Sequence, residues 1–365
     1  MAARPMDAFI SSTALVALAE IGDKTQLLAL VLAARFRRPV PIVLGILFAT
    51  LANHALAAWL GASAAAWLEG PWFGAAVAVI GSGPLGLTSA LLAQAAGAQV
   101  TIYARELVPE MPSLRATGSF TPDSRIALAD AVDPGFPDLW ERMARASFKR
   151  YGSLLGLAGE PVRWMDRYLV SDPGPAPPRP APAPSQGNEP SFVNYSRRLR
   201  DLFPRTQLLE PGATPFHGFT VWRQENLMFN LASYASTLVG QFRLAGGRIE
   251  RREFHSPGEL AELPEKVVIN CTGYGARALL GDESVVPVRG QIAWLIPQAD
   301  FDYGLAYNGV NVVPRSDGIC VQAVSGGDMR GYGEDSLVPD RAEADEAVAT
   351  LAALYASFGR ARAPS

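Results

Sequence analysis

The sequence is short of cysteine, histidine and excess charge, and each shortage excludes a class of protein. Its 365 residues contain two cysteines, Cys271 and Cys320, and three histidines. Two cysteines so far apart make neither a disulfide framework nor a zinc site, and the histidines lack metal-ligand spacing. Lysine and arginine total 32 against 35 aspartate and glutamate, a net charge of -3. The sequence has no excess of basic residues with which to bind nucleic acid, so we expect no nucleic-acid partner.

Charge is nearly absent from two long stretches near the N-terminus. Residues 8–34 form one apolar segment and residues 39–68 form another. Each is long enough to cross a hydrocarbon core of about 30 Å as a helix, which takes about 20 residues. The linker between them, RFRRP, is arginine-rich and ends in a helix-breaking proline. We predict a two-helix transmembrane hairpin over residues 1–70 that contacts the lipid bilayer through residues 8–68; the alternative is a buried soluble helical hairpin.

The first apolar segment nevertheless contains ionisable residues at bilayer depth. Its letters EIGDKT place Glu20, Asp23 and Lys24 within two helical turns. Such groups cost about 2.5–3.5 kcal/mol each at the bilayer centre, so they are normally paired and functional. We therefore expect a functional role for Glu20, Asp23 and Lys24.

A different pattern begins at residue 75. An apolar run, AAVAVI, leads to a glycine turn, a helical stretch and a β-branched strand within about 30 residues. Gly81, Gly83 and Gly86 form G-x-G-x-x-G, in which the second glycine lets a pyrophosphate approach the backbone. The helix N-terminus adds free N–H groups and a positive dipole end. The predicted dinucleotide-binding residues are Gly81, Ser82, Gly83, Pro84, Leu85 and Gly86. A glycine-rich turn without a ligand is the alternative.

A ribose-binding acid is expected about 20 residues after this loop, at the end of the second strand. The strand ends in YARE, so Glu106 or the backbone near Ala104 and Arg105 must serve. The acid lies one or two positions late, which weakens an NAD assignment more than an FAD assignment.

The remaining sequence divides at a proline-rich stretch. Residues 75–172 form the predicted cofactor-binding region, and residues 173–190 form an extended surface insertion. Residues 191–358 hold the remainder of the cofactor and substrate domains. A helix is expected over residues 225–247. Strands are expected at residues 248–254, 266–270, 290–296 and 318–324.

Over residues 75–358 the sequence resembles the D-amino-acid oxidase and D-aspartate oxidase family of FAD flavoproteins. Four stretches carry the resemblance: VAVIGSGPLGL; RATGSFTPDS; VVINCTGYGARALLGD with VPVRGQI; and YNGVNVVP. The resemblance implies an α/β fold, in which an FAD-binding Rossmann-like domain is joined to a mixed-sheet substrate domain. It also implies oxidative deamination of D-amino acids to 2-oxo acids, ammonia and hydrogen peroxide.

The same resemblance assigns roles to residues. Beyond the glycine loop, the implied FAD-binding residues are Arg105, Arg115, Ala116, Thr117, Gly118, Phe254, Thr272 and Gly273. The implied catalytic residues are Tyr307, Asn311 and Gln291, the last through a backbone N–H that follows Gly290 and points at the flavin. The substrate is a small D-amino acid, and the cofactor carries the chemistry.

Two departures from the family pattern limit the expected activity. The family's active-site strand carries two tyrosines, and Asn311 stands at the second. The family's carboxylate-binding run, R-x-G-x-R-P-x-R-P, is absent, although Arg360 and Arg362 lie in that region. Losing such an arginine forfeits about 1.5–3 kcal/mol per charge-assisted hydrogen bond. We expect the C-terminal end of the family domain to be missing, with impaired turnover and FAD affinity.

Residues 7–70 resemble the first half-repeat of a cation transporter family of bacterial and Golgi membranes, which exchanges Mn²⁺ or Ca²⁺ for protons. Its signature E-x-G-D-K/R-T is matched from Glu20 to Thr25. The resemblance implies Glu20 and Asp23 as metal ligands, with Thr25 and Asn53 as further oxygen donors, and hard oxygen ligands suit Mn²⁺ or Ca²⁺. The family carries the motif twice, in two facing three-helix repeats, whereas this sequence has one motif and two helices. A homo-oligomer could pair two such segments. The alternatives are a membrane anchor, or a transporter fragment fused to an inactive flavoprotein domain by the joining of two reading frames.

The resemblance to transporters implies localisation at the inner or plasma membrane. Flavin loading and unpaired cysteines favour a cytoplasmic flavin domain. The three arginines of the interhelical loop, against Arg4 before it, favour a cytoplasmic loop and hence the opposite orientation. Both orientations remain open, and in each the hairpin places its two flanks on one side.

Overall fold

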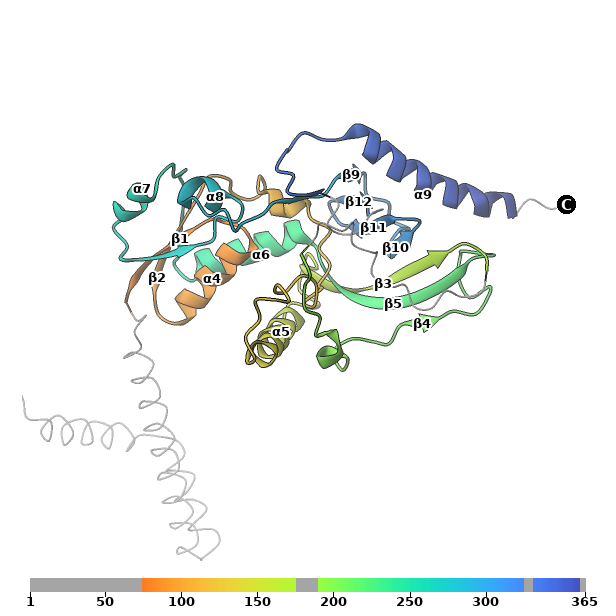
Figure 1. Cartoon of the computed structure of the whole chain (residues 1–365), viewed down its shortest axis with the longest axis horizontal. Helices are drawn as coiled ribbons and strands as arrows, with labels where there is room; N and C mark the ends of the chain where they lie inside the picture. Colours follow the sequence, from red (N-terminus) through yellow and green to blue (C-terminus); the bar gives the residue numbers. More distant parts are fainter. Residues whose placement is uncertain (1–73, 175–189, 325–330, 362–365) are drawn as a thin grey trace, which may run out of the picture. The chain divides into compact units, whose positions relative to one another are not determined.

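The computed structural model describes residues 74–174, 190–324 and 331–361, all within the unit Gly74–Ser365 (Figure 1). The predicted transmembrane hairpin, with Glu20 and Asp23, lies outside these residues, and so does nearly all of the predicted insertion 173–190. Across the described ranges, no helix is long and apolar enough to cross a bilayer.

The first described sheet is parallel throughout and has the strand order β6-β2-β1-β7. Its strands are β1 (Ala76–Ile80), β2 (Gln99–Ala104), β6 (Arg248–Arg251) and β7 (Val267–Asn270). The apolar run in β1 is buried because helices cover the sheet, as parallel sheets require. Because all strands run the same way, the segments that follow them meet at one edge, which we call the carboxyl edge.

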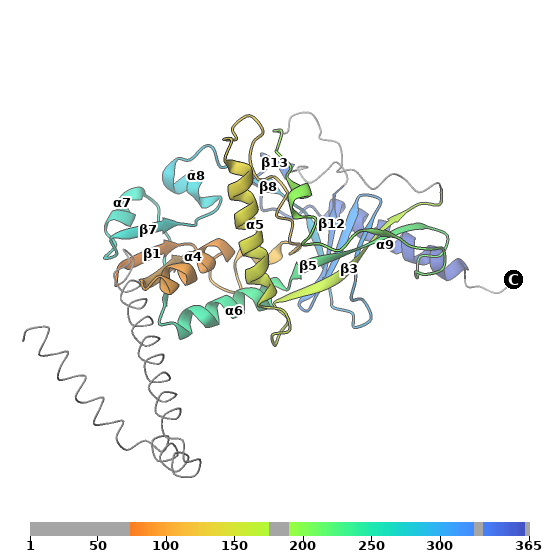
Figure 2. The same cartoon turned by 90° about the horizontal axis from the view of Figure 1, so that it is seen from below.

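Two helices pack side by side against this sheet (Figure 2). Helix α4 (Pro84–Ala95) begins with proline at its first turn, and α6 (Leu231–Leu244) runs beside it. The Gln94 side chain of α4 donates to the backbone oxygen of Phe242 at 3.1 Å. A single core of Val79, Leu87 and Phe242 results. Short helices α7 (Pro257–Ala261) and α8 (Gly275–Leu280) complete this part.

The second described sheet is mixed and has the order β4-β5-β3-β10-β11-β12-β9. Its strands are β3 (Val162–Ser171), β4 (Gln207–Leu208), β5 (Thr220–Phe229), β9 (Ile292–Leu295), β10 (Gly304–Tyr307), β11 (Val310–Arg315) and β12 (Gly318–Ala323). Helix α9 (Arg341–Ala361) covers one face (Figure 1), where Ala347 and Leu354 join Leu305 and Val312 in the core. Strands β8 (Val288–Arg289) and β13 (Gly331–Tyr332) form a separate pair.

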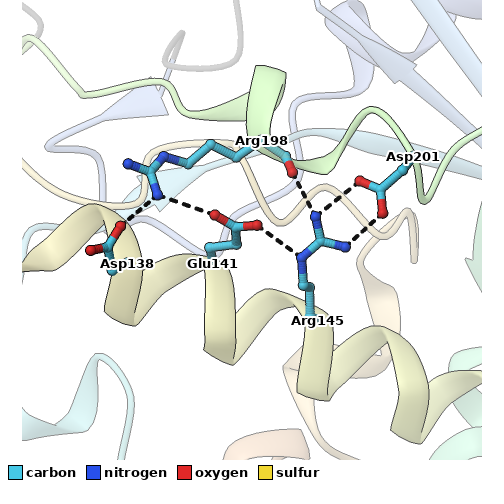
Figure 3. Close-up of polar contacts among 5 residues, drawn as sticks. All are labelled: Asp138, Glu141, Arg145, Arg198 and Asp201. Carbon is cyan, nitrogen blue, oxygen red and sulfur yellow. Dashed lines mark hydrogen bonds and ion pairs between the residues drawn. The ribbon is translucent and has the colours of Figure 1, made fainter.

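An ion-pair network joins α5 (Phe136–Gly152) to the short helix η2 (Ser196–Leu199) (Figure 3). Arg145 donates to Glu141 at 2.9 Å and to both oxygens of Asp201 at 2.7 and 2.9 Å. Arg198 bridges Asp138 at 2.7 Å and Glu141 at 3.1 Å. These guanidinium hydrogen bonds lower the pKa of Glu141, and Arg145 lowers the pKa of Asp201. The network attaches the chain that follows residue 190 to α5.

Two expected elements are wrong in detail. The helix expected over residues 225–247 begins only at Leu231, because residues 225–229 are the second half of strand β5, which pairs along its whole length with β3. The stretch YNGVNVVP is a hairpin rather than one strand. Tyr307 ends β10, Asn308 and Gly309 turn with positive φ, and β11 follows. The α/β class, with a parallel sheet and a mixed sheet, is confirmed.

Candidate functional site

The three glycines of the loop after β1 serve different purposes. Gly81 has φ +114°, and a Cβ there would collide with the Cys271 carbonyl group; a Cβ on Gly86 would collide with the carbonyl of Gly81. These two glycines are required by packing between β1, α4 and β7. Gly83 is different, because a Cβ there would meet nothing closer than the Ser113 hydroxyl at 3.8 Å. A side chain at Gly83 would therefore enter open space, and we call this space beside Gly83 the cradle.

The cradle lies at the N-terminus of α4. Gly83 is the N-cap residue, and no side chain caps the first turn. Leu85 in that turn is 77% exposed. The Ser82 hydroxyl points elsewhere, because it donates to the backbone oxygen of Glu106 at 2.6 Å. An uncapped helix start beside an open glycine suits an anionic group such as a pyrophosphate.

Two more predicted cofactor residues follow the neighbouring strands at the same carboxyl edge. Arg105, after β2, donates to Glu106 at 2.6 Å and to Glu253 at 3.2 Å. Phe254 follows β6 and packs edge-on against Tyr103, with ring centroids 6.0 Å apart. The carboxylate of Glu106, which comes one or two positions later in the sequence than expected, thus lies at this edge. The ribose-binding acid was expected at the same edge.

The end of β7 completes this edge. Thr272 donates its backbone N–H and its hydroxyl to Asn270 at 3.2 and 2.8 Å. Gly273 is exposed with φ +57°, a conformation that favours glycine. Burial raises the pKa of the Cys271 thiol, which marks it as a packed rather than a reactive group.

The segment from Met111 to Gly118 connects the glycine loop to the mixed sheet. At its start, the Ser82 hydroxyl lies 3.1 Å from the sulfur of Met111. The short helix η1 (Pro112–Arg115) follows, and then come Ala116, Thr117 and Gly118. At its end, the backbone N–H of Phe229 donates to the Gly118 oxygen at 2.7 Å. The predicted residues of this segment therefore lie between the two sheets.

The predicted catalytic residues are not all brought together. Tyr307 pairs with Val310, whereas Asn311 pairs with Ala306 and Gln322, so Tyr307 and Asn311 point to opposite faces. Tyr307 belongs to the face under α9, where its hydroxyl donates to Asp172 at 2.8 Å. Burial and Asp172 raise the pKa of Tyr307.

Asn311 lies on the other face, which we call the open face. There its Oδ1 accepts from Nη2 of Arg167 at 2.8 Å. A Cβ on Gly290 would lie 3.1 Å from the amide nitrogen of Gln322. The Gln291 side chain is engaged within the protein, since its Oε1 accepts from the backbone N–H of Asp340 at 2.7 Å. That the backbone N–H of Gln291 contacts a cofactor stays a prediction.

Sequence reasoning missed three residues of the open face: Arg167, Arg315 and Gln322. A signal for one of them was present, because the alternation Arg163, Met165, Arg167 in β3 puts cations on the face of buried Met165. Pairing between strands far apart in the chain was needed to place Arg167 and Gln322 beside Asn311, and Arg315 on the same face. Among the described residues, no group of three or more His, Cys, Asp or Glu could hold a metal ion.

Two family models match the chain. The model of FAD dependent oxidoreductases matches residues 76–364. The model named "Divalent cation/proton antiporter GDT1" matches residues 8–96. The ranges overlap on β1, the glycine loop and α4, which have the strand-turn-helix structure of a dinucleotide-binding unit.

The chain is similar both to a described exporter and to D-amino-acid oxidases. A protein of Vibrio cholerae serotype O1 described as a manganese exporter is 62% identical over 64 residues, which are 18% of this chain and 32% of the exporter. A D-amino-acid oxidase of Streptomyces coelicolor is 29% identical over 239 residues, which are 62% of this chain and 64% of the oxidase. A D-amino-acid oxidase of Rubrobacter xylanophilus is 35% identical over 140 residues, 36% of this chain and 40% of that enzyme. The chain thus spans less than two thirds of the length of each.

Proposed function

Because the chain belongs to the FAD dependent oxidoreductase family over residues 76–364, and FAD is the cofactor of that family, we propose that it oxidises D-amino acids. The reaction converts a D-amino acid, O2 and water into a 2-oxo acid, ammonia and hydrogen peroxide. Both oxidases matched above carry this name, which supports the substrate class.

One observation carries the proposal. The glycine loop and the residues that follow β2, β6 and β7 share the carboxyl edge of one parallel sheet, where α/β proteins bind nucleotides. The fit to FAD is favourable, because Gly83 leaves a cradle open at the uncapped start of α4. We propose that Gly81–Gly86 hold the pyrophosphate, that Glu106 and Arg105 lie near the ribose, and that Ala116–Gly118 and Thr272–Gly273 line the flavin.

The open face of the mixed sheet supplies the proposed substrate contacts. FAD, when bound, supplies the two-electron acceptor that takes a hydride from the α-carbon and passes the electrons to O2. The guanidinium of Arg167 and the amide of Asn311 hold the substrate carboxylate by charge-assisted hydrogen bonds. Nearby Ile292 and Trp294 present apolar surface that excludes water. The residues align the substrate, and no protein nucleophile is required.

The test uses the purified full chain in detergent. We expect a bound-flavin absorption spectrum, and hydrogen peroxide formed with D-amino acids but not with their L-enantiomers. A panel of neutral, basic and acidic D-amino acids would define the side-chain preference. A colourless protein that forms no peroxide after FAD is added would exclude the proposal.

A second function is favoured by the 62% identity to the manganese exporter. We propose that residues 8–68 cross the membrane and bind Mn²⁺ or Ca²⁺ through Glu20 and Asp23, with the chain at the inner or plasma membrane. Uptake of Mn²⁺ into vesicles that contain the full chain should fall when Glu20→Gln is introduced. Uptake that is equal in the variant and in the parent chain would exclude this function, and it would leave the flavin proposal unaffected.

A further inference from the structure

One buried arginine holds the segment between the two sheets in place. Arg315 is the last residue of β11, and 2% of its side chain is exposed. A buried guanidinium is unfavourable unless its charge and its donors are satisfied. Its Nε and Nη2 donate to the two carboxylate oxygens of Asp317 at 2.9 and 2.7 Å. This planar pairing fixes the orientation of the guanidinium.

The remaining terminal nitrogen of Arg315 reaches the segment that begins beside the glycine loop. Its Nη1 donates to the backbone oxygen of Leu114 at 3.0 Å and to that of Ala116 at 2.8 Å. These two carbonyl groups lie on either side of Arg115 and directly before Thr117. A residue of the mixed sheet therefore fixes the backbone that the proposal places along the flavin.

Trp294 completes this group, which we call the Arg315 clamp: Arg315, Asp317, Trp294 and the carbonyl groups of Leu114 and Ala116. The guanidinium carbon of Arg315 lies 4.9 Å from the Trp294 ring centroid, and the indole N–H donates to the Asp317 backbone oxygen at 3.0 Å. A Cβ on Gly318 would collide with this ring. Trp294 lies on β9, shortly after Gly290 and Gln291, whose backbone the family resemblance places near the flavin.

The Arg315 clamp does not merely attach the segment Met111–Gly118 to the rest of the fold. The downstream end is attached independently, because Phe229 N–H donates to Gly118 at 2.7 Å and Phe120 N–H donates to Leu227 at 2.9 Å. Without Arg315 the chain would still be tied at residues 118–120. What Arg315 adds is the position of residues 114–116 relative to β9.

We propose that Arg315 is a positioning residue for the flavin: it sets the spacing between Leu114–Gly118 and β9, and thereby the affinity for FAD and the surroundings of its ring. The inference rests on the proposed cofactor site and assigns a role to a residue outside the family motifs. A loose segment would have to be ordered each time FAD binds, and that ordering would weaken binding.

The experiment compares three variants of the full chain. Arg315→Leu with Asp317→Asn removes the guanidinium and the carboxylate charge together, so no unpaired buried charge remains. Arg315→Lys keeps the charge but cannot bridge the carboxylate and both carbonyl groups. The matched control is Arg163→Leu, on the same face, whose guanidinium donates to the Pro314 oxygen at 3.2 Å. Melting of the apoprotein reports the purely structural effect of each change.

The first readout is independent of FAD. Amide hydrogen exchange of residues 114–118 in the apoprotein should become about tenfold faster or more in the double variant, with a smaller change in Arg315→Lys. Residues 119–120 and the control should change by less than about twofold. Unchanged exchange at residues 114–118 would overturn the clamp itself, even if the parent chain bound no flavin.

The second readout is the flavin. The double variant should bind FAD about tenfold more weakly or worse and shift the visible flavin spectrum, while the control matches the parent. If melting falls but FAD affinity and spectrum stay at the parent values, Arg315 is merely structural and the inference is wrong. A parent chain without FAD binding would instead count against the proposed function.

Discussion

At the scale of single residues, the glycine loop separates what the sequence could and could not predict. The spacing of Gly81, Gly83 and Gly86 predicted a dinucleotide loop, because each role follows from a missing side chain. Which glycine faces the ligand was visible only once β7 and α4 packed around the loop. Gly81 and Gly86 are required by protein packing, and Gly83 is required by the proposed cofactor.

This division gives the first prediction. Gly83→Ala should leave apoprotein melting nearly unchanged and weaken FAD binding by about tenfold or more, because its Cβ enters the pyrophosphate cradle. Fluorescence titration with FAD measures the affinity. Gly240→Ala in α6 is the matched control, since a Cβ there meets no atom within 4 Å. Equal affinities in the two variants would contradict the placement of the cofactor.

A second prediction separates Asn311 from Tyr307, which the sequence placed together and the strand pairing places on opposite faces. Asn311→Leu should raise KM for D-amino acids about tenfold, because a hydrogen bond beside Arg167 is lost on the proposed substrate face. Tyr307→Phe should instead cost about 1 kcal/mol of stability through its lost bond to Asp172 and change KM little. Steady-state kinetics and thermal melting provide the measurements. A tenfold KM effect in Tyr307→Phe alone would assign the substrate to the face under α9.

At the scale of elements, the helix expected over residues 225–247 shows where local reasoning fails. The letters ENLMF fit a helix as well as a strand, and propensity alone does not decide between them. The ladder with β3, which pairs Val162 with Phe229 and continues to Ser171, makes these residues a strand. That partner lies far away in the chain, so tertiary pairing overrides local preference.

The contact between α5 and η2 gives a third prediction, on pH. Glu141 has a lowered pKa in the folded chain, so its stabilising effect is present above the ordinary glutamate pKa of about 4.3 and is lost as pH falls further. Parent and Glu141→Gln proteins should therefore differ in melting temperature at pH 6, and the gap should close below about pH 4. The network is exposed to solvent, so added salt should also narrow the gap. A gap that persists at pH 3 would mean that the glutamine acts through packing rather than charge.

At the scale of the whole molecule, composition predicted two chemically different parts. Two family models match the chain, one over residues 8–96 and the other over residues 76–364. The parallel sheet was predictable because β1 and β7 are short apolar runs, each followed by a glycine turn. The mixed sheet was predicted only as separate strands. In its order, β3 lies between β5 and β10, although β10 is far from both in sequence. This order depends on long-range pairing that no local pattern encodes.

The fourth prediction concerns the membrane. If residues 8–68 span the bilayer as predicted, the full chain should sediment with membranes, resist extraction by high salt and alkaline carbonate, and enter solution with detergent. Immunoblotting of the fractions measures this. A chain found in the salt-soluble fraction would favour the buried soluble hairpin.

The direction of β1 has a practical consequence. The chain enters the parallel sheet at Gly74 and reaches the glycine loop at Gly81, at the far end of a strand about 16 Å long. If a support surface, an affinity handle or an electrode linker is attached before Gly74, the space beside Gly83 therefore stays open to diffusing reagents. An attachment in the η1 region would cover that space.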